Sequence, residues 1–118
     1  MAYQRLKNYL RTYRRRHGFS QEEISRLLGA SSGTKVSRYE SFSRHPALIA
    51  VFAYEIIFNT PVRELFAGTY DSVRRDVRER AAHLLKAIGP NAGNPRTARK
   101  LDALRRIVES QGPNRTAS

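Results

Sequence analysis

Apolar side chains recur at helical spacing along almost the whole chain, and this pattern constrains the fold more than any other feature of the sequence. The stretches with this spacing cover residues 3–17, 21–29, 33–40, 47–58, 62–66, 71–88 and 96–109. The first five are closely spaced, as in a small bundle, whereas the last two are amphipathic. The sequence therefore predicts an all-α fold, with a five-helix bundle followed by two C-terminal amphipathic helices.

The same spacing predicts which residues form the core. The residues expected to be buried are Leu6, Leu10 and Tyr13 in the first stretch, Ile24, Leu27 and Leu28 in the second, and Val36 and Tyr39 in the third. The fourth stretch, residues 47–58, is apolar on most sides. A helix that is apolar all round is usually surrounded by protein, so we expect this one to be the buried central helix.

Polar residues and glycines mark where the second and third helices begin and end. Ser20 and Glu23 have the spacing of a capping box, which starts a helix at Gln21. Gly29 ends that helix, and Ser32 is suited to cap the next one. These signals predict two short helices joined by a tight turn.

The chain divides into two parts and a tail. Thr60 and Pro61 are expected to cap and open a fifth helix, which Gly68 closes. We therefore predict a first domain over residues 1–68, a helical extension over 69–110 and a disordered tail over 111–118. The first helix of the extension carries an apolar stripe of Val73, Val77, Ala81, Leu84 and Ile88. This stripe either pairs with a second copy or another protein, or folds back onto the first bundle.

The charge of the chain indicates a polyanionic partner. Lysine and arginine number 22 against 10 acidic residues, which gives a formal net charge of +12. Most of the basic residues are arginines, which favours bidentate contacts to phosphates and bases. Charge alone leaves nucleic acid and acidic lipid open, with nucleic acid the first expectation.

Several classes of protein do not fit the sequence. The chain has no cysteine, so it forms neither disulfides nor thiolate metal sites. Its longest apolar run is far shorter than the roughly 20 residues of a membrane span, and its N-terminus lacks the pattern of a secretory signal. We therefore expect a cytoplasmic protein.

The sequence also gives no indication of catalysis. The three histidines, His17, His45 and His83, have no metal-ligand spacing, and neither a P-loop nor a dinucleotide-binding glycine motif occurs. We expect no enzyme activity, no cofactor and no metal.

The segment from residue 20 to residue 40 has the features of a helix-turn-helix. Ser25 provides a small contact between the two helices, Gly29 the turn, and Val36 with Tyr39 the inward face of the second helix. The residues left for the outer surface are Thr34, Lys35, Ser37 and Arg38. A helix with such a surface can enter the major groove of DNA, where arginine matches the acceptors of guanine.

At these residues the chain resembles the Cro/phage-repressor-like (XRE) family of helix-turn-helix regulators. The similarity runs through GFSQEEISRLLG (18–29), TKVSRYE (34–40), Pro46 and Leu65-Phe66, and covers about residues 4–67. It implies a repressor-like five-helix bundle that presents its third helix to double-stranded DNA. Two departures from the family pattern are a turn that is one residue longer, at residues 30–33, and a loop one residue shorter, at residues 40–46.

The resemblance also implies a role for individual residues. Gln21 would contact phosphate, Gly33, Thr34, Ser37 and Arg38 would lie at base edges, and Ser41 and Arg44 would contact the DNA backbone. Because the turn is longer than usual, Ser32 and Lys35 are also counted among the DNA-binding residues. Arg14 and Glu40 match positions that form a structural pair. For Ser37 a base contact and a solvated position both stay open, as do phosphate contact and a solvated face for Arg11, Arg15 and Arg16.

The function expected from these features is sequence-specific transcriptional regulation by a bacterial or phage repressor-type protein. A homodimer formed through the C-terminal helices would read two half-sites. Two alternatives remain: an antitoxin-like module that binds a protein partner and controls its own gene, and an architectural protein that binds nucleic acid without sequence preference.

Overall fold

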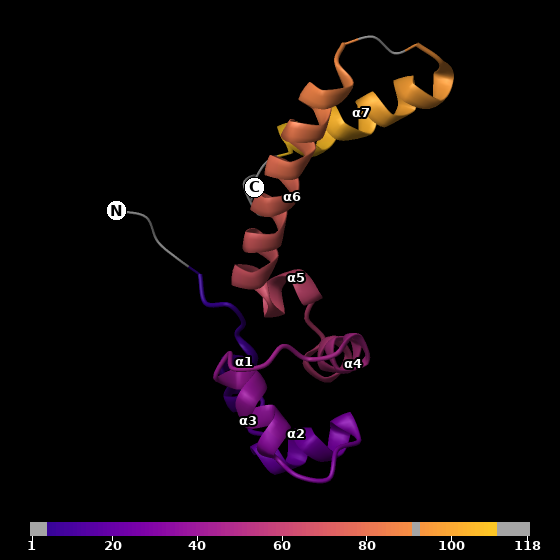
Figure 1. The fold of residues 1–118 in the computed structure, drawn as a ribbon. Coiled ribbons are helices and arrows are strands. Elements are labelled where there is room, and N and C mark those ends of the chain that lie inside the picture. Colours follow the sequence, from indigo (N-terminus) through magenta and orange to yellow (C-terminus); the bar gives the residue numbers. More distant parts are fainter. Residues whose placement is uncertain (1–4, 91–92, 111–118) are drawn as a thin grey trace. The chain divides into compact units, whose positions relative to one another are not determined.

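The computed structural model describes residues 5–90 and 93–110, and within these residues the protein is all-α, as predicted, with seven helices and no strand (Figure 1). The helices are α1 (Leu10–Arg16), α2 (Gln21–Leu28), α3 (Thr34–Glu40), α4 (Leu48–Phe58), α5 (Val62–Leu65), α6 (Ala67–Ile88) and α7 (Pro95–Glu109). They form two units, of which the first ends at Tyr70 and the second begins at Asp71. The predicted disordered tail lies outside the described residues.

The first unit has a single core, to which all of its first five helices contribute. Its buried members are Leu10, Ile24, Val36, Tyr39, Tyr54, Phe58, Leu65 and Phe66. The predicted burial of Leu10, Ile24, Val36 and Tyr39 is thus confirmed. The predictions for Leu6 and Leu27 were wrong, since both side chains are about half exposed.

The first helix begins later than the sequence predicted. Residues 5–9 are not helical, and α1 starts at Leu10. The reason is that the backbone of this segment forms hydrogen bonds with a distant part of the chain: the Tyr9 N–H donates to the Leu65 carbonyl at 2.8 Å, and the Gly68 N–H donates to the Leu6 carbonyl at 2.9 Å. These tertiary hydrogen bonds replace the helical ones, and we call residues 5–9 the N-terminal strap.

A buried asparagine fixes the end of the N-terminal strap. The Asn8 side chain donates from Nδ2 to the Tyr39 carbonyl at 3.0 Å, and its Oδ1 accepts from the Leu10 N–H at 3.1 Å. The side-chain amide of Asn8 thus provides a hydrogen-bond partner both for a backbone N–H at the start of α1 and for a backbone carbonyl at the end of α3. Periodicity could not have indicated this, because it depends on a residue 31 positions away.

The start of α2 agrees with its predicted capping box. The Ser20 hydroxyl accepts from the Glu23 N–H at 3.1 Å, and the Glu23 carboxylate accepts from the Ser20 N–H at 2.8 Å. At the other end, Gly29 adopts a left-handed conformation with φ of 81°. Only a residue without Cβ adopts this conformation at low cost, so Gly29 can turn the chain directly after α2.

Three other boundary predictions were wrong. The cap position of α3 is held by Gly33 and not by Ser32, whose Oγ is a distant 3.4 Å acceptor for the Thr34 N–H. Thr60 does not cap α5, because its hydroxyl donates backwards to the Phe58 carbonyl and Pro61 occupies the cap position. Gly68 does not close a helix: α6 already begins at Ala67.

Helix α4 is not the buried central helix that the sequence predicted. It packs against α2 and α5, and only Tyr54 and Phe58 are fully buried. The opposite side exposes Leu48 (66%), Ile49 (81%), Phe52 (53%) and Ile56 (79%). Within the described residues, α4 has too few neighbours to cover all its apolar side chains, so one face stays exposed.

In the second unit α7 turns back and crosses α6 (Figure 1). Ala81 of α6 and Leu101 and Leu104 of α7 are buried, and the Arg78 guanidinium donates twice to the Val108 carbonyl, at 3.1 and 3.3 Å. The predicted stripe on α6 is therefore divided: Ala81 is buried, whereas Val73, Val77 and Leu84 remain exposed. We call these three residues the α6 apolar face.

Candidate nucleic-acid interface

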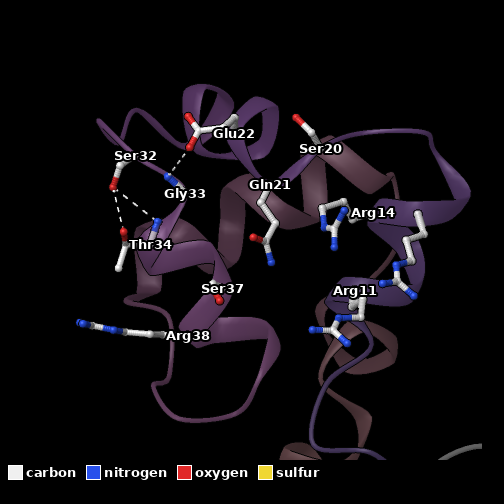
Figure 2. Close-up of a pocket in the computed structure, with 11 residues that line it drawn as sticks. Arg11, Arg14, Ser20, Gln21, Glu22, Ser32, Gly33, Thr34, Ser37 and Arg38 are labelled. Atoms are coloured by element: carbon white, nitrogen blue, oxygen red, sulfur yellow. Dashed lines mark hydrogen bonds between the residues drawn. The ribbon is translucent and has the colours of Figure 1, made fainter.

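A groove of about 780 Å³ lies on the first unit where α1, the start of α2 and α3 come together (Figure 2). Its lining residues are Arg11, Arg14, Arg15, Ser20, Gln21, Glu22, Ser32, Gly33, Thr34, Ser37 and Arg38. Six of the nine residues predicted to bind DNA are among them. The lining of the groove is basic, because it includes four arginines and one acidic residue, Glu22.

The groove owes its shape to the tight packing of α2 against α3. Ser25 is buried in α2, and its hydroxyl donates to the Ser32 carbonyl at 2.5 Å. A larger side chain at this position would hold the helices apart. On the groove side, the Gly33 N–H donates to the Glu22 carboxylate at 3.1 Å, which fixes the first turn of α3 against the start of α2.

The outer surface of α3 carries the residues that the sequence assigned to it. Thr34, Lys35, Ser37 and Arg38 are all exposed, while Val36 and Tyr39 between them are buried. Figure 2 shows Thr34, Ser37 and Arg38 along α3, on the opposite side of the groove from Arg11. Lys35 instead lines a smaller groove of about 310 Å³, formed with Gly29, Ala30, Ser31 and Ser32.

A buried carboxylate organises the floor of the groove. The Glu40 side chain is only 1% exposed, and Arg14 donates to it from Nε at 2.6 Å and from Nη2 at 3.0 Å. The third nitrogen of the guanidinium, Nη1, donates to the Phe19 carbonyl at 3.0 Å. Hydrogen bonding to Glu40 raises the pKa of Arg14. The pair expected from the sequence is therefore present, and it connects α1 with the end of α3.

Two further groove residues share this carboxylate. Gln21 donates from Nε2 to Glu40 at 3.1 Å, and the Arg11 Nε lies 3.6 Å from the same oxygen. The contact of Gln21 with phosphate stays a prediction. In the structure its side chain makes an internal hydrogen bond to Glu40. The amide has a second N–H, so holding Glu40 leaves one donor for another acceptor.

The two remaining predicted residues lie in the loop after α3 and do not line the groove. Ser41 donates to the Arg38 carbonyl at 3.2 Å, and the Arg44 N–H donates to the same carbonyl at 3.3 Å. Both residues are exposed. They are thus placed in the loop beside the end of α3.

The sequence did not single out Glu22, and it left Arg11 and Arg15 undecided. The two arginines are four residues apart and so share one side of α1, which was the available signal. Glu22 gave no signal, because a carboxylate in the first turn of a helix is ordinary. Glu22 stands out only in the structure, because its carboxylate accepts a hydrogen bond from the Gly33 N–H.

The described residues contain no cluster of three or more histidine or acidic side chains suited to a metal ion. Among the same residues, no helix combines the length and the apolar character needed to cross a membrane. A comparison with known proteins found no matching family model, and no curated protein or solved structure matched the chain either.

Proposed function

We propose that the protein is a cytoplasmic regulator that binds double-stranded DNA in a sequence-specific manner. The observation that carries the proposal is the groove, in which the exposed polar residues of α3 face arginines of α1. A helix such as α3 fits the major groove of DNA, with Arg38 suited to guanine and Thr34 and Ser37 to several bases. The resemblance of residues 18–40 to the Cro/repressor-like family supports the same function.

In this proposal affinity and specificity come from different residues. Arg11, Arg15 and Arg44 neutralise phosphates and release counterions, which supplies most of the binding free energy and makes it depend on salt. Arg38 and Thr34 read base edges. In this proposal the regulator acts by occupying its site on the DNA.

Two half-sites would supply the specificity that one short reading helix lacks. We propose that the protein is a homodimer through the second unit, because the α6 apolar face is not covered by α7. Exposed apolar residues at this spacing are typical of helix pairing. Half-sites are then expected about 34–36 Å apart, or a multiple of that distance.

Selection of bound sequences from random duplex DNA at physiological salt tests the proposal. Enrichment of a palindrome is the expected result, and its spacing would report the geometry of the dimer. Salt-dependent binding without any enriched sequence would instead support an architectural protein that binds DNA through charge alone.

A further inference from the structure

The exposed side of α4 is a second unoccupied surface, in the first unit and separate from the groove. We call Leu48, Ile49, Phe52 and Ile56 the α4 apolar face. None of them lines the grooves described above. Isolated exposed leucines are common in soluble proteins, but four large apolar side chains on one helix face indicate an interaction surface.

The charge of this surface is unlike that of the rest of the chain. The protein carries a formal net charge of +12, yet α4 contains no basic residue and a single acidic one, Glu55. A nucleic acid or the charged head group of an acidic lipid therefore finds no basic side chain on this helix. Contact between two copies of such a basic chain through α4 therefore brings no basic side chains of this helix together.

The spacing of the apolar residues matches the same face of a second copy. Leu48, Phe52 and Ile56 are four residues apart, so they form one ridge along α4 that is symmetric about Phe52. If two such helices cross in opposite directions at a two-fold axis beside Phe52, Leu48 of each copy lies against Ile56 of the other. An isologous contact needs this self-complementarity. Antiparallel helices also place their dipoles in a favourable orientation.

The area of the surface is sufficient for such a contact. The four residues are each exposed by half or more, which amounts to an apolar patch of roughly 500 Å², in the range of functional patches on monomers. Pairing two copies would bury about 1,000 Å² in total, at the lower limit for a specific interface. We infer that the α4 apolar face binds the same face of a second copy of this chain. This inference does not depend on DNA binding or on the α6 apolar face.

A cysteine cross-link tests the arrangement directly, because the chain has no cysteine of its own. The full chain with Phe52→Cys is expected to form a disulfide-linked dimer under mild oxidation, since the axis brings the two copies of residue 52 together. Leu48→Cys alone and Ile56→Cys alone should not link, because each residue lies about 12 Å from its own copy along the axis. An equal mixture of those two variants should link.

The matched control is Glu64→Cys, an exposed position on α5. Equal cross-linking of the Phe52 and Glu64 variants would mean random collision and would overturn the inference. Protection of Phe52→Cys from both oxidant and alkylation would also overturn it, since the face would then be covered by the chain itself.

A second measurement avoids the partly packed Phe52. Ile56→Arg changes a side chain that is 79% exposed, so the fold is expected to survive, as circular dichroism can verify. In the Val77→Arg background, where the α6 apolar face carries a charge and does not pair, sedimentation of the full chain should show self-association weakened at least tenfold by Ile56→Arg. The comparison variant Val77→Arg, on the α6 apolar face, should leave the Phe52→Cys cross-link intact. A cross-link lost in Val77→Arg, or sedimentation unchanged by Ile56→Arg in the Val77→Arg background, would refute pairing through α4.

Discussion

The backbone of Gly68 lies directly against the backbone of Leu6. The Gly68 N–H donates to the Leu6 carbonyl at 2.9 Å, and a Cβ on Gly68 would overlap with that carbonyl group. The N-terminal strap can therefore reach the start of α6 only because residue 68 has no side chain. Gly68 therefore allows two backbone segments to come close together, whereas the sequence suggested that it ends a helix.

Gly68→Ala should consequently destabilise the protein, even though alanine is the better helix former. We expect the free energy of unfolding to fall by about 2–4 kcal/mol, because backbone atoms have to move apart. Chemical denaturation measures the change. Ala82→Gly, at an exposed position of the same helix, is the control and should cost only about 1 kcal/mol, through helix propensity. A Gly68→Ala protein as stable as the wild type would show that the strap is not held there.

Tyr54 supplies a second stability prediction. Its ring packs beside Phe58, but its buried hydroxyl has no hydrogen-bond partner. A buried unsatisfied hydroxyl is costly, so Tyr54→Phe should raise the free energy of unfolding by about 1 kcal/mol. Tyr54→Leu, which also removes the ring, should lower it. A destabilised Tyr54→Phe variant would mean that the hydroxyl has a partner after all.

The same hydroxyl predicts how stability depends on pH. Burial raises the pKa of Tyr54 above its ordinary value of 10.0, and the nearby Glu40 carboxylate raises it further. The unfolded chain therefore loses this proton at lower pH than the folded one, and stability falls as the pH rises above about 10. Tyr54→Phe should lose less stability than the wild type between pH 9 and 11. Parallel curves for the two proteins would contradict the prediction.

Glu40 is expected to be the most sensitive polar residue of the first unit. Glu40→Gln leaves the Arg14 guanidinium without its counter-ion in a site where Arg14 is only 12% exposed. Removing one partner of a buried pair costs about 3–5 kcal/mol, which urea denaturation can measure. A double-mutant cycle with Arg14→Gln should show strong coupling, whereas a cycle with Arg105→Gln, in the second unit, should show none.

Arg38 and Arg44 should separate base reading from phosphate binding. We expect Arg38→Ala to cost about 1–3 kcal/mol on the selected DNA site and much less on random DNA, because Arg38 lines the groove. Arg44 lies outside the groove. Arg44→Ala should therefore weaken binding to the selected site and to random DNA alike, and should make binding depend less on salt. Equal losses for Arg38→Ala on the two DNAs would remove its role in base readout. Binding titrations at several salt concentrations measure both effects.

Arg11 and Arg15 are expected to bind phosphate. Each alanine variant should weaken specific and random DNA binding equally and lower the salt slope by about one. Arg16→Ala is the matched control, because Arg16 lies on the same helix but stacks over the Tyr13 ring at 5.2 Å and does not line the groove. A loss from Arg16→Ala as large as that from Arg11→Ala would indicate a diffuse charge effect.

What the sequence could predict was local. The Ser20–Glu23 capping box, the turn at Gly29 and the alternation of buried and exposed residues in α3 all depend on neighbours within a few positions, and the structure contains them. The late start of α1 could not be predicted, because the Leu65 carbonyl that holds Tyr9 is far away in sequence. Likewise the composition of α4 indicated that it is apolar but not how many neighbours it has.

The Glu40 carboxylate also has a consequence for the entropy of ligand binding. Flexible arginine and glutamine side chains ordinarily lose rotamer freedom when they meet a ligand, at a cost of about 0.5–1.5 kcal/mol each. Here Arg14 and Gln21 are already held by an internal anion, so much of that loss occurs when the chain folds. If an anion binds in the groove as proposed, it would meet a Gln21 side chain that the folded protein has already ordered, so less entropy would be lost on binding.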